Sequence, residues 1–321
     1  MEDAIKNFNK QFSFNPEIVN KENLDTHNNF IVCGMGGSHL ATGLLKMYKP
    51  GINLYVHRDY GLPPYDDEFL KDSLLIASSY SGNTEEVVDF LEEGYSKGYK
   101  MAVISTGGKL IEFAKENNLP YVELPDTGIQ PRSALGYSLI GMSALVGEYP
   151  CCDGLKKLEN VLNPISLKEE GKSLAENLKG KIPIIYSSTR NLPLAYNWKI
   201  KMNETGKVPA FYNVFSELNH NEMAGMDVID TTKELSKNLH FIFLKDPSDN
   251  PKVQNRMDVT EKLYEERGLN VTKLTLVGDS LFEKVFNSLI LADWIALSIA
   301  NGNGAEAEQV PIIEEFKRMI A

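Results

Sequence analysis

Short apolar runs that end in a glycine or serine turn and lead into a helical pattern recur along this chain. Three such units are NFIVCGMGGSHLATGLLKMY, LLIASSYSGNTEEVVDFLEEG and MAVISTGGKLIEFAKENN. INLYVHRDY and YVELP are further strand candidates. Short apolar strands separated by helices of this length are typical of a parallel sheet that is covered on both faces. The alternation therefore predicts an α/β fold.

A second alternation follows a gap. The residues after Cys152 are rich in lysine and glutamate and show no strand pattern until KIPIIYSST at 181–189. Further strand candidates lie at 240–246 and 270–278, with helical patterns between them. We place a domain boundary in this gap and expect two domains, 1–153 and 154–321, each a parallel sheet flanked by helices. The length of 321 residues suits two domains.

Composition narrows the classes of partner. Hydrophobic residues make up 42% of the chain and charged residues 24%, which favours a packed core over disorder. The net charge of −11 argues against nucleic acid as a partner, since nucleic-acid-binding proteins carry basic surfaces. No run of about 18 apolar residues suggests a membrane span. The three cysteines, Cys33, Cys151 and Cys152, form no zinc or disulfide pattern, and we expect a cytoplasmic protein.

The turn GMGGS, Gly34 to Ser38, follows a predicted strand and opens a helix. A helix N-terminus with flexible glycines suits a phosphate group, because its amide N–H groups are unpaired and carry partial positive charge. The dinucleotide fingerprint is incomplete, since His39 stands where its third glycine belongs. Taken alone, the turn fits a tight connection without ligand equally well.

The turn SSYSGNTEE, Ser78 to Glu86, carries three hydroxyls, on Ser79, Ser81 and Thr84. Hydroxyls and convergent backbone amides can bind a phosphate without basic residues, in keeping with the acidic composition. The alternative is a capping box with Ser81 or Thr84 as N-cap. A third turn, Ser105 to Gly108, follows the next predicted strand. Since the carboxyl ends of parallel strands share one edge of the sheet, these turns predict a ligand crevice there.

These motifs, with PRSALGY and NWKIKMNETGKVPAFYNVFSELNHNEMAG further along, carry a resemblance. The chain resembles the sugar isomerase (SIS) fold family, and within it the bifunctional phosphoglucose/phosphomannose isomerases of archaea and some bacteria. The resemblance runs from about residue 28 to the C-terminal helix. It implies two SIS-type subdomains and an aldose–ketose isomerase without cofactor or metal. It also implies a homodimer with active sites at the interface.

The resemblance also implies roles for individual residues. It assigns the sugar phosphate's phosphoryl group to Gly37, Ser38, Ser79, Ser81 and Thr84. Arg132 matches an arginine near the reacting carbons, Glu204 the carboxylate that moves the proton between C1 and C2, and His220 and Lys317 the ring-opening pair. Each has a plainer alternative: a solvated arginine after proline, a glutamate at a helix end, a structural histidine and a lysine on an amphipathic helix. The polar neighbours Asn219, Asn221 and Glu222 are expected to fix the tautomer of His220.

The implied chemistry suits these residue types. An aldose phosphate becomes a ketose phosphate through ring opening, proton abstraction at C2 and proton delivery to C1, which a carboxylate and a histidine can perform. Glucose and mannose 6-phosphates differ only at C2 and collapse to one enediol, so one site can serve both. No metal-ligand spacing occurs in the sequence.

Two alternatives stay open. One is another isomerase or epimerase of the same fold; glutamine-dependent glucosamine synthesis is disfavoured, because only about 28 residues precede the first strand. The other is a sugar-phosphate sensor that binds without turnover, although neither end of the chain has room for a DNA-binding helix-turn-helix. Glu204 and His220 together favour an enzyme over a sensor.

Overall fold

The computed structural model describes residues 1–320, and its contacts divide the chain into two compact units. The N-terminal unit is Asn7–Val161, and the C-terminal unit is formed by Met1–Lys6 with the residues from Leu162 onward. The boundary expected after residue 153 falls inside helix α7 (Tyr149–Lys156). The N-terminal unit instead contains all of α7 and the short α8 (Leu158–Val161) that follows it.

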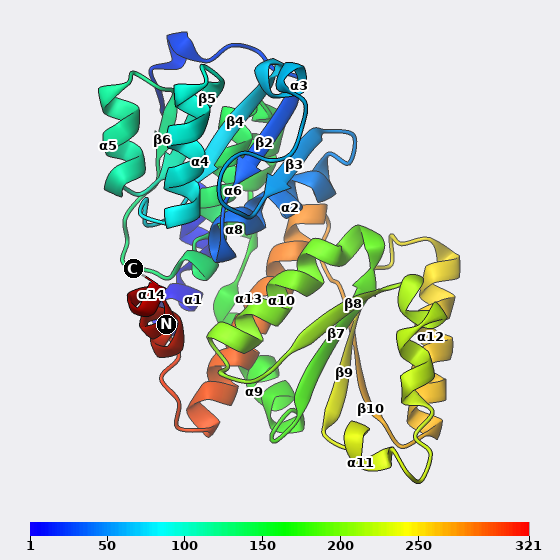
Figure 1. Ribbon diagram of the computed structural model, residues 1–321. Helices are drawn as coiled ribbons and strands as arrows, with labels where there is room; N and C mark the ends of the chain where they lie inside the picture. Colours follow the sequence, from blue (N-terminus) through cyan, green and yellow to red (C-terminus); the bar gives the residue numbers. More distant parts are fainter. Residues whose placement is uncertain (321) are drawn as a thin grey trace. The chain divides into compact units, whose positions relative to one another are not determined.

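The N-terminal unit is built on a six-stranded sheet of order β1-β6-β5-β4-β2-β3 (Figure 1). Its strands are β1 (Ile18–Val19), β2 (Asn29–Cys33), β3 (Asn53–His57), β4 (Ser73–Ser78), β5 (Lys100–Ser105) and β6 (Tyr121–Glu123). Five of them run parallel, as the alternation predicts, and β1 pairs antiparallel with β6 at one edge.

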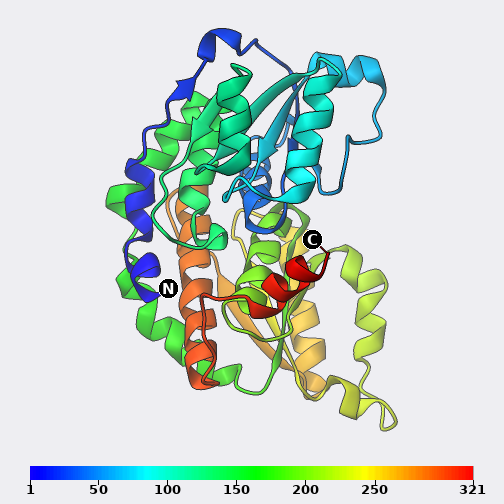
Figure 2. The ribbon, with the colours of Figure 1, turned by 60° about the vertical axis from the view of Figure 1, so that its left-hand side comes forward.

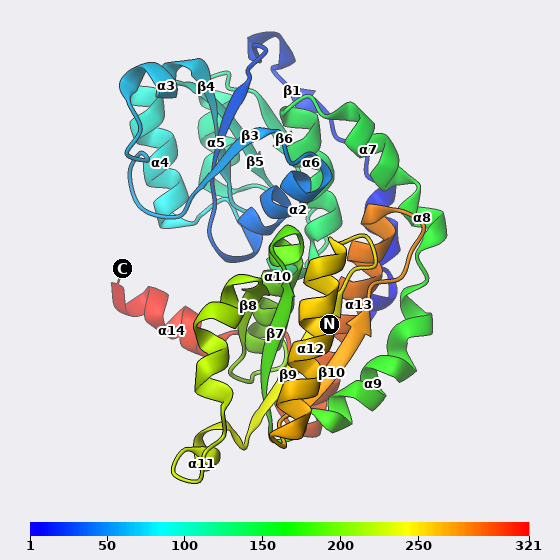
Figure 3. The ribbon, with the colours of Figure 1, turned by 90° about the vertical axis from the view of Figure 1, so that its right-hand side faces the viewer.

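Helices cover both faces of this sheet. α4 (Glu85–Ser96) and α5 (Gly108–Glu116) pack on one face, and α2 (Leu40–Tyr48) and α6 (Leu135–Leu145) lie on the other (Figure 3). α6 is buried on every side and shows no polar face, as expected of a helix enclosed in a core. The short α3 (Asp67–Asp72) leads into β4.

The C-terminal unit has a four-stranded, wholly parallel sheet of order β10-β9-β7-β8. Its strands are β7 (Ile182–Ser188), β8 (Phe211–Phe215), β9 (Leu239–Lys245) and β10 (Asn270–Thr275). The sequence patterns predict β7, β9 and β10 but miss β8. This strand lies at the edge of the sheet and is largely exposed, so it lacks the continuous apolar run of a central strand.

The helices of this unit also form two layers (Figure 1). α12 (Pro251–Glu266) covers one face of the sheet, and α10 (Leu192–Glu204) covers the other with α13 (Leu281–Gly302) and α9 (Lys168–Asn177) beside it. α13 is long and apolar enough to cross a membrane, but 78% of its most apolar stretch is buried inside the structure. A buried ion pair, Lys201 to Asp293 at 2.7 Å, joins α10 to α13.

Three further helices complete the unit. They are α1 (Glu2–Lys6), α11 (Lys233–Ser236) and α14 (Pro311–Ile320). α14, drawn red in Figure 2, follows α13 through an irregular connection and has no buried residue.

Candidate active site

The turn after β4 gathers the three predicted hydroxyls. Ser79 is almost completely buried, and its Oγ lies 2.8 Å from Thr84 Oγ1 and 3.5 Å from Ser81 Oγ. The Gly82 amide donates to Ser79 Oγ at 3.2 Å, which closes the turn. The hydroxyls therefore converge at the N-terminus of α4, where a helix attracts negative charge.

The alternative role of this turn, a helix cap, is met in position but not in hydrogen bonding. Thr84 occupies the N-cap position of α4, but its side chain makes no capping hydrogen bond. Its hydroxyl faces Ser79 instead. Ser81 is exposed, and its Oγ makes two long contacts, with the Asn83 amide at 3.4 Å and with Ser79 Oγ at 3.5 Å. The hydroxyls of Thr84 and Ser81 are thus not used to cap the helix and remain able to bind a ligand.

The GMGGS turn joins the same edge of the sheet. Ser38 lies in the 3-10 turn Gly36–His39 after β2, and its Oγ accepts a hydrogen bond from the Tyr80 amide at 2.9 Å. A Cβ on Gly37 would lie 2.8 Å from the Arg132 backbone nitrogen, so only glycine permits this approach. Burial, with Arg58 nearby, lowers the pKa of His39 to about 4, so that this imidazole is neutral at pH 7.

The third turn, Ser105 to Gly108, is hydrogen-bonded to the turn after β4. The Thr106 and Ser105 hydroxyls both donate to the Tyr80 carbonyl, at 2.7 and 3.3 Å. Tyr80 therefore connects all three turns through its backbone, with its amide bound to Ser38 and its carbonyl to the third turn. Sequence reasoning did not single out Tyr80, and it could not have done so, because backbone groups leave no signature in residue type.

Arg132 is buried, with 1% of its surface exposed. It lies in the 3-10 turn Pro131–Ser133, whose backbone adjoins Gly37. The alternative of a solvated surface arginine is therefore wrong. A buried arginine is expected only where it is paired or serves a site. The N-terminal unit thus brings Gly37, Ser38, Ser79, Ser81, Thr84 and the Arg132 backbone to one edge of its sheet.

Glu204 belongs to the C-terminal unit and is the last residue of α10. It is half-buried, and its backbone carbonyl accepts a hydrogen bond from Lys207 Nζ at 2.6 Å. Glu204 therefore lies at a helix end, as the plainer alternative expects, but it is not fully exposed to solvent as that alternative requires.

His220 ends the 3-10 turn Glu217–His220 that follows β8, and its side chain is exposed. The expected contacts from its polar neighbours are absent. Asn219 binds Thr260 and Arg256, Asn221 binds Glu217, and Glu222 binds Tyr186 and Asn213. The prediction that these neighbours fix the tautomer of His220 is therefore wrong for this structure.

Lys317 lies on α14, is largely exposed, and pairs with Glu314 at 2.9 Å. That i, i+3 pair is what a solvated amphipathic helix would have in any case. Glu204, His220 and Lys317 thus belong to three separate elements of the C-terminal unit.

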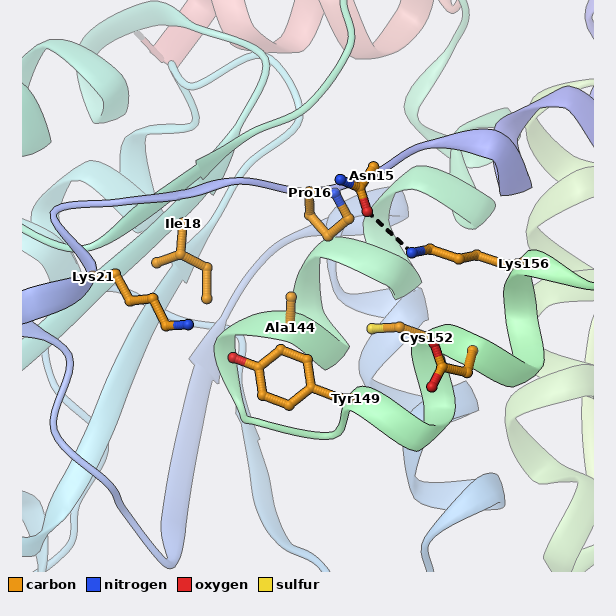
Figure 4. Close-up of a pocket in the computed structure, with 9 residues that line it drawn as sticks. Asn15, Pro16, Ile18, Lys21, Ala144, Tyr149, Cys152 and Lys156 are labelled. Atoms are coloured by element: carbon orange, nitrogen blue, oxygen red, sulfur yellow. Dashed lines mark hydrogen bonds between the residues drawn. The ribbon is translucent and has the colours of Figure 1, made fainter.

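Possible metal ligands, the cysteine thiols and the cavity described next contribute nothing to the predicted site. Within residues 1–320, no three histidine, cysteine or acidic side chains cluster as metal ligands would. Burial raises the pKa of the Cys33 and Cys151 thiols to about 12, so that both are protonated at pH 7. A cavity of about 170 Å³ lies between segment 15–21 and α7, and the predicted site residues do not line it (Figure 4).

Comparison with known proteins identifies the family. Residues 167–320 match the family model of the bacterial phospho-glucose isomerase C-terminal SIS domain. The chain is 33% identical to the bifunctional phosphoglucose/phosphomannose isomerase of Aquifex aeolicus (strain VF5), over 98% of this chain and 96% of that protein. The protein of the same name from Caldicellulosiruptor bescii is 35% identical over 91% of this chain and 89% of its own.

Solved structures agree on the fold. The glucosamine-6-phosphate deaminase of Thermotoga maritima superposes with a TM-score of 0.70 and 15% identity, over 96% of this chain and 95% of that one. The α/β architecture with two SIS-type parallel sheets, expected from the sequence, is thereby confirmed. This chain belongs to the bifunctional phosphoglucose/phosphomannose isomerase family and is an isomerase.

Proposed function

We propose that this protein interconverts glucose 6-phosphate and mannose 6-phosphate with fructose 6-phosphate through a shared enediol. The observation that carries the proposal is the group of hydroxyls on Ser79, Ser81 and Thr84 at the start of α4, which the helix does not use as caps. Membership of the isomerase family supports the reaction type.

In this proposal the phosphoryl group of the sugar binds to the three hydroxyls and to Ser38. Ser81 and Thr84 donate to phosphate oxygens, and the amides at the start of α4 add the field of the helix N-terminus. The Ser38 hydroxyl, which accepts from the Tyr80 amide, keeps its own proton for donation. Gly37 lets the first turn approach closely enough to take part.

The carbon chemistry falls to residues of other elements. Glu204 removes the proton at C2 and returns it at C1, and its half-buried position limits competition from water. Arg132 stabilises the negative charge that develops on the enediolate oxygens. His220 and Lys317 move the proton of the ring oxygen during opening. The route transfers only protons, so its chemistry requires neither cofactor nor metal.

We further propose that the protein acts as a homodimer in the cytoplasm. α14 supports the first part, because it exposes the apolar side chains Ile312, Ile313, Phe316, Met319 and Ile320, which a second copy would cover. Three free cysteines, all buried, suit a reducing compartment. Analytical ultracentrifugation tests the dimer. The unmodified protein should sediment as a dimer and Phe316→Asp as a monomer, and a dimeric variant would contradict the role of α14.

The function is tested by incubating the protein with fructose 6-phosphate and following the products by NMR. Both aldose phosphates should appear, at a rate that a chelator leaves unchanged. Glucose 6-phosphate alone would remove the mannose activity from the proposal. Tight binding without conversion would identify a sensor, and formation of a different sugar phosphate would identify another activity of the SIS fold.

A further inference from the structure

The segment that carries His220 is held firmly although the His220 side chain itself is free. Among residues 1–320 no hydrogen-bond partner of the imidazole is found, and the side chain is exposed. Two residues earlier, Leu218 is fully buried in the core of the C-terminal unit. Asn219 Nδ2 donates to Thr260 Oγ1 on α12 at 2.9 Å. The backbone before His220 is thus fixed from one side.

Glu222 fixes the segment from the other side. One of its carboxylate oxygens, Oε1, accepts from the Tyr186 hydroxyl, and Oε2 accepts from Asn213 Nδ2 at 2.5 Å. Tyr186 on β7 and Asn213 on β8 are directly opposite each other in the strand pairing. The Glu222 carboxylate therefore bridges a matched pair of residues on neighbouring strands.

The anchor itself is rigid. Tyr186 has no exposed surface, and its ring packs against Phe215, Phe241 and Phe243 with centroid distances of 5.4 to 5.8 Å. Burial raises the pKa of Tyr186, so that its hydroxyl keeps its proton and donates at any working pH. A side chain packed in this way has little freedom to move, so its hydrogen bond to Glu222 holds the loop to the sheet.

We propose that Glu222 is a positioning residue that holds His220 in place by tying its loop to β7 and β8. The inference rests on the proposed role of His220 in ring opening. Position matters because a displacement of about 1 Å can cost roughly a hundredfold in rate. Glu222 is two residues from His220, so the bonds that hold its carboxylate also limit how far the backbone at His220 can shift.

The first experiment is the kinetics of Glu222→Gln. A glutamine has one side-chain oxygen, so it can accept a hydrogen bond from only one of the two donors, Tyr186 or Asn213. Its NH₂ group then faces the remaining donor, and that hydrogen bond is lost. We expect kcat to fall about ten- to a hundredfold. KM should change little, since the proposed phosphate contacts lie in the other unit. Glu217→Gln is the matched control: it changes a hydrogen-bonded carboxylate of the same loop without touching β7 or β8, and kcat should be retained.

The deciding experiment is a double-mutant cycle with His220→Asn. If Glu222 acts through His220, Glu222→Gln should cause almost no further loss of kcat in the His220→Asn background. Independent, multiplying losses would overturn the positioning role while leaving His220 catalytic. Full activity of His220→Asn would overturn both the proposed role of His220 and this inference, so the two failures are distinguishable.

Tyr186→Phe provides a second variant should Glu222→Gln not fold. It removes one donor to the carboxylate and keeps the ring in its aromatic surroundings. The expected result is again a fall in kcat that disappears in the His220→Asn background. A fall that persists there would overturn the proposal.

Discussion

Thr84→Val tests whether the turn after β4 binds phosphate or only starts a helix. Valine has nearly the shape of threonine and removes only the hydroxyl. In the structure that hydroxyl lies 2.8 Å from Ser79 Oγ and makes no capping bond to α4. The variant should therefore lose a ligand contact and little stability.

The magnitude follows from the charge of the ligand. A hydrogen bond to a charged group contributes about 1.5 to 3 kcal/mol. Losing one such bond corresponds to a rise in KM for fructose 6-phosphate of about 10- to 150-fold. Some loss of kcat is expected too, because binding of the remote phosphate helps to position the reacting carbons.

The helix-cap alternative gives the opposite result. Loss of an N-cap hydroxyl costs about 1 kcal/mol of stability, which lowers the melting temperature of a protein of this size by a few degrees. Steady-state kinetics and thermal unfolding on the same preparation separate the two readings, with Thr84→Ser as the control that keeps the hydroxyl. An unchanged KM with a lowered melting temperature would refute the phosphate site.

Two further predictions concern catalysis and pH. Glu204→Gln should keep sugar-phosphate binding, measured by calorimetry, while kcat falls about 100- to 10,000-fold, because an amide cannot accept the carbon-bound proton; near-normal turnover would remove Glu204 from the mechanism. The pKa of His39 is about 4 in the folded protein against an ordinary 6.5, so the unfolded state binds the extra proton and stability should fall as the pH drops from about 6.5 to 4. Urea unfolding of His39→Asn should show a smaller fall over that window, and an identical pH dependence would contradict the assignment.

The sequence predicts best what depends on local pattern. β2, β4 and β5 are buried apolar runs with polar turns behind them, so their strand–turn–helix order can be read directly. The sequence patterns do not predict β8, because it is an exposed edge strand, or β1, because it has only two residues. Periodicity carries no signal for either.

The site residues also divide into those that a local sequence pattern predicts and those that it does not. The hydroxyls after β4 can be found because residue type and spacing specify them. The burial of Arg132 and the partners of Glu222 depend on which residues meet across the fold, and no local pattern encodes that. The N-cap position of Thr84 can be predicted, but whether its hydroxyl bonds to Ser79 or to the helix depends on the conformation of the turn, which residue type alone does not specify.

The interlocking of two turns gives a last test of the phosphate site. Gly82 has φ of 71°, and a Cβ there would lie 1.8 Å from the Gly107 carbonyl oxygen, which as backbone cannot step aside. Gly98 has a similar φ of 75°, but a Cβ there would point into open space. Gly98→Ala therefore measures only the cost of a left-handed backbone at a residue with a side chain, about 1 to 2 kcal/mol. Gly98→Ala should lower the melting temperature by a few degrees and leave KM unchanged. Gly82→Ala should in addition push the turn that carries Ser79 and Thr84 away from its neighbour and raise KM strongly. Equal effects of the two substitutions on both quantities would mean that the site does not depend on contact between the turns.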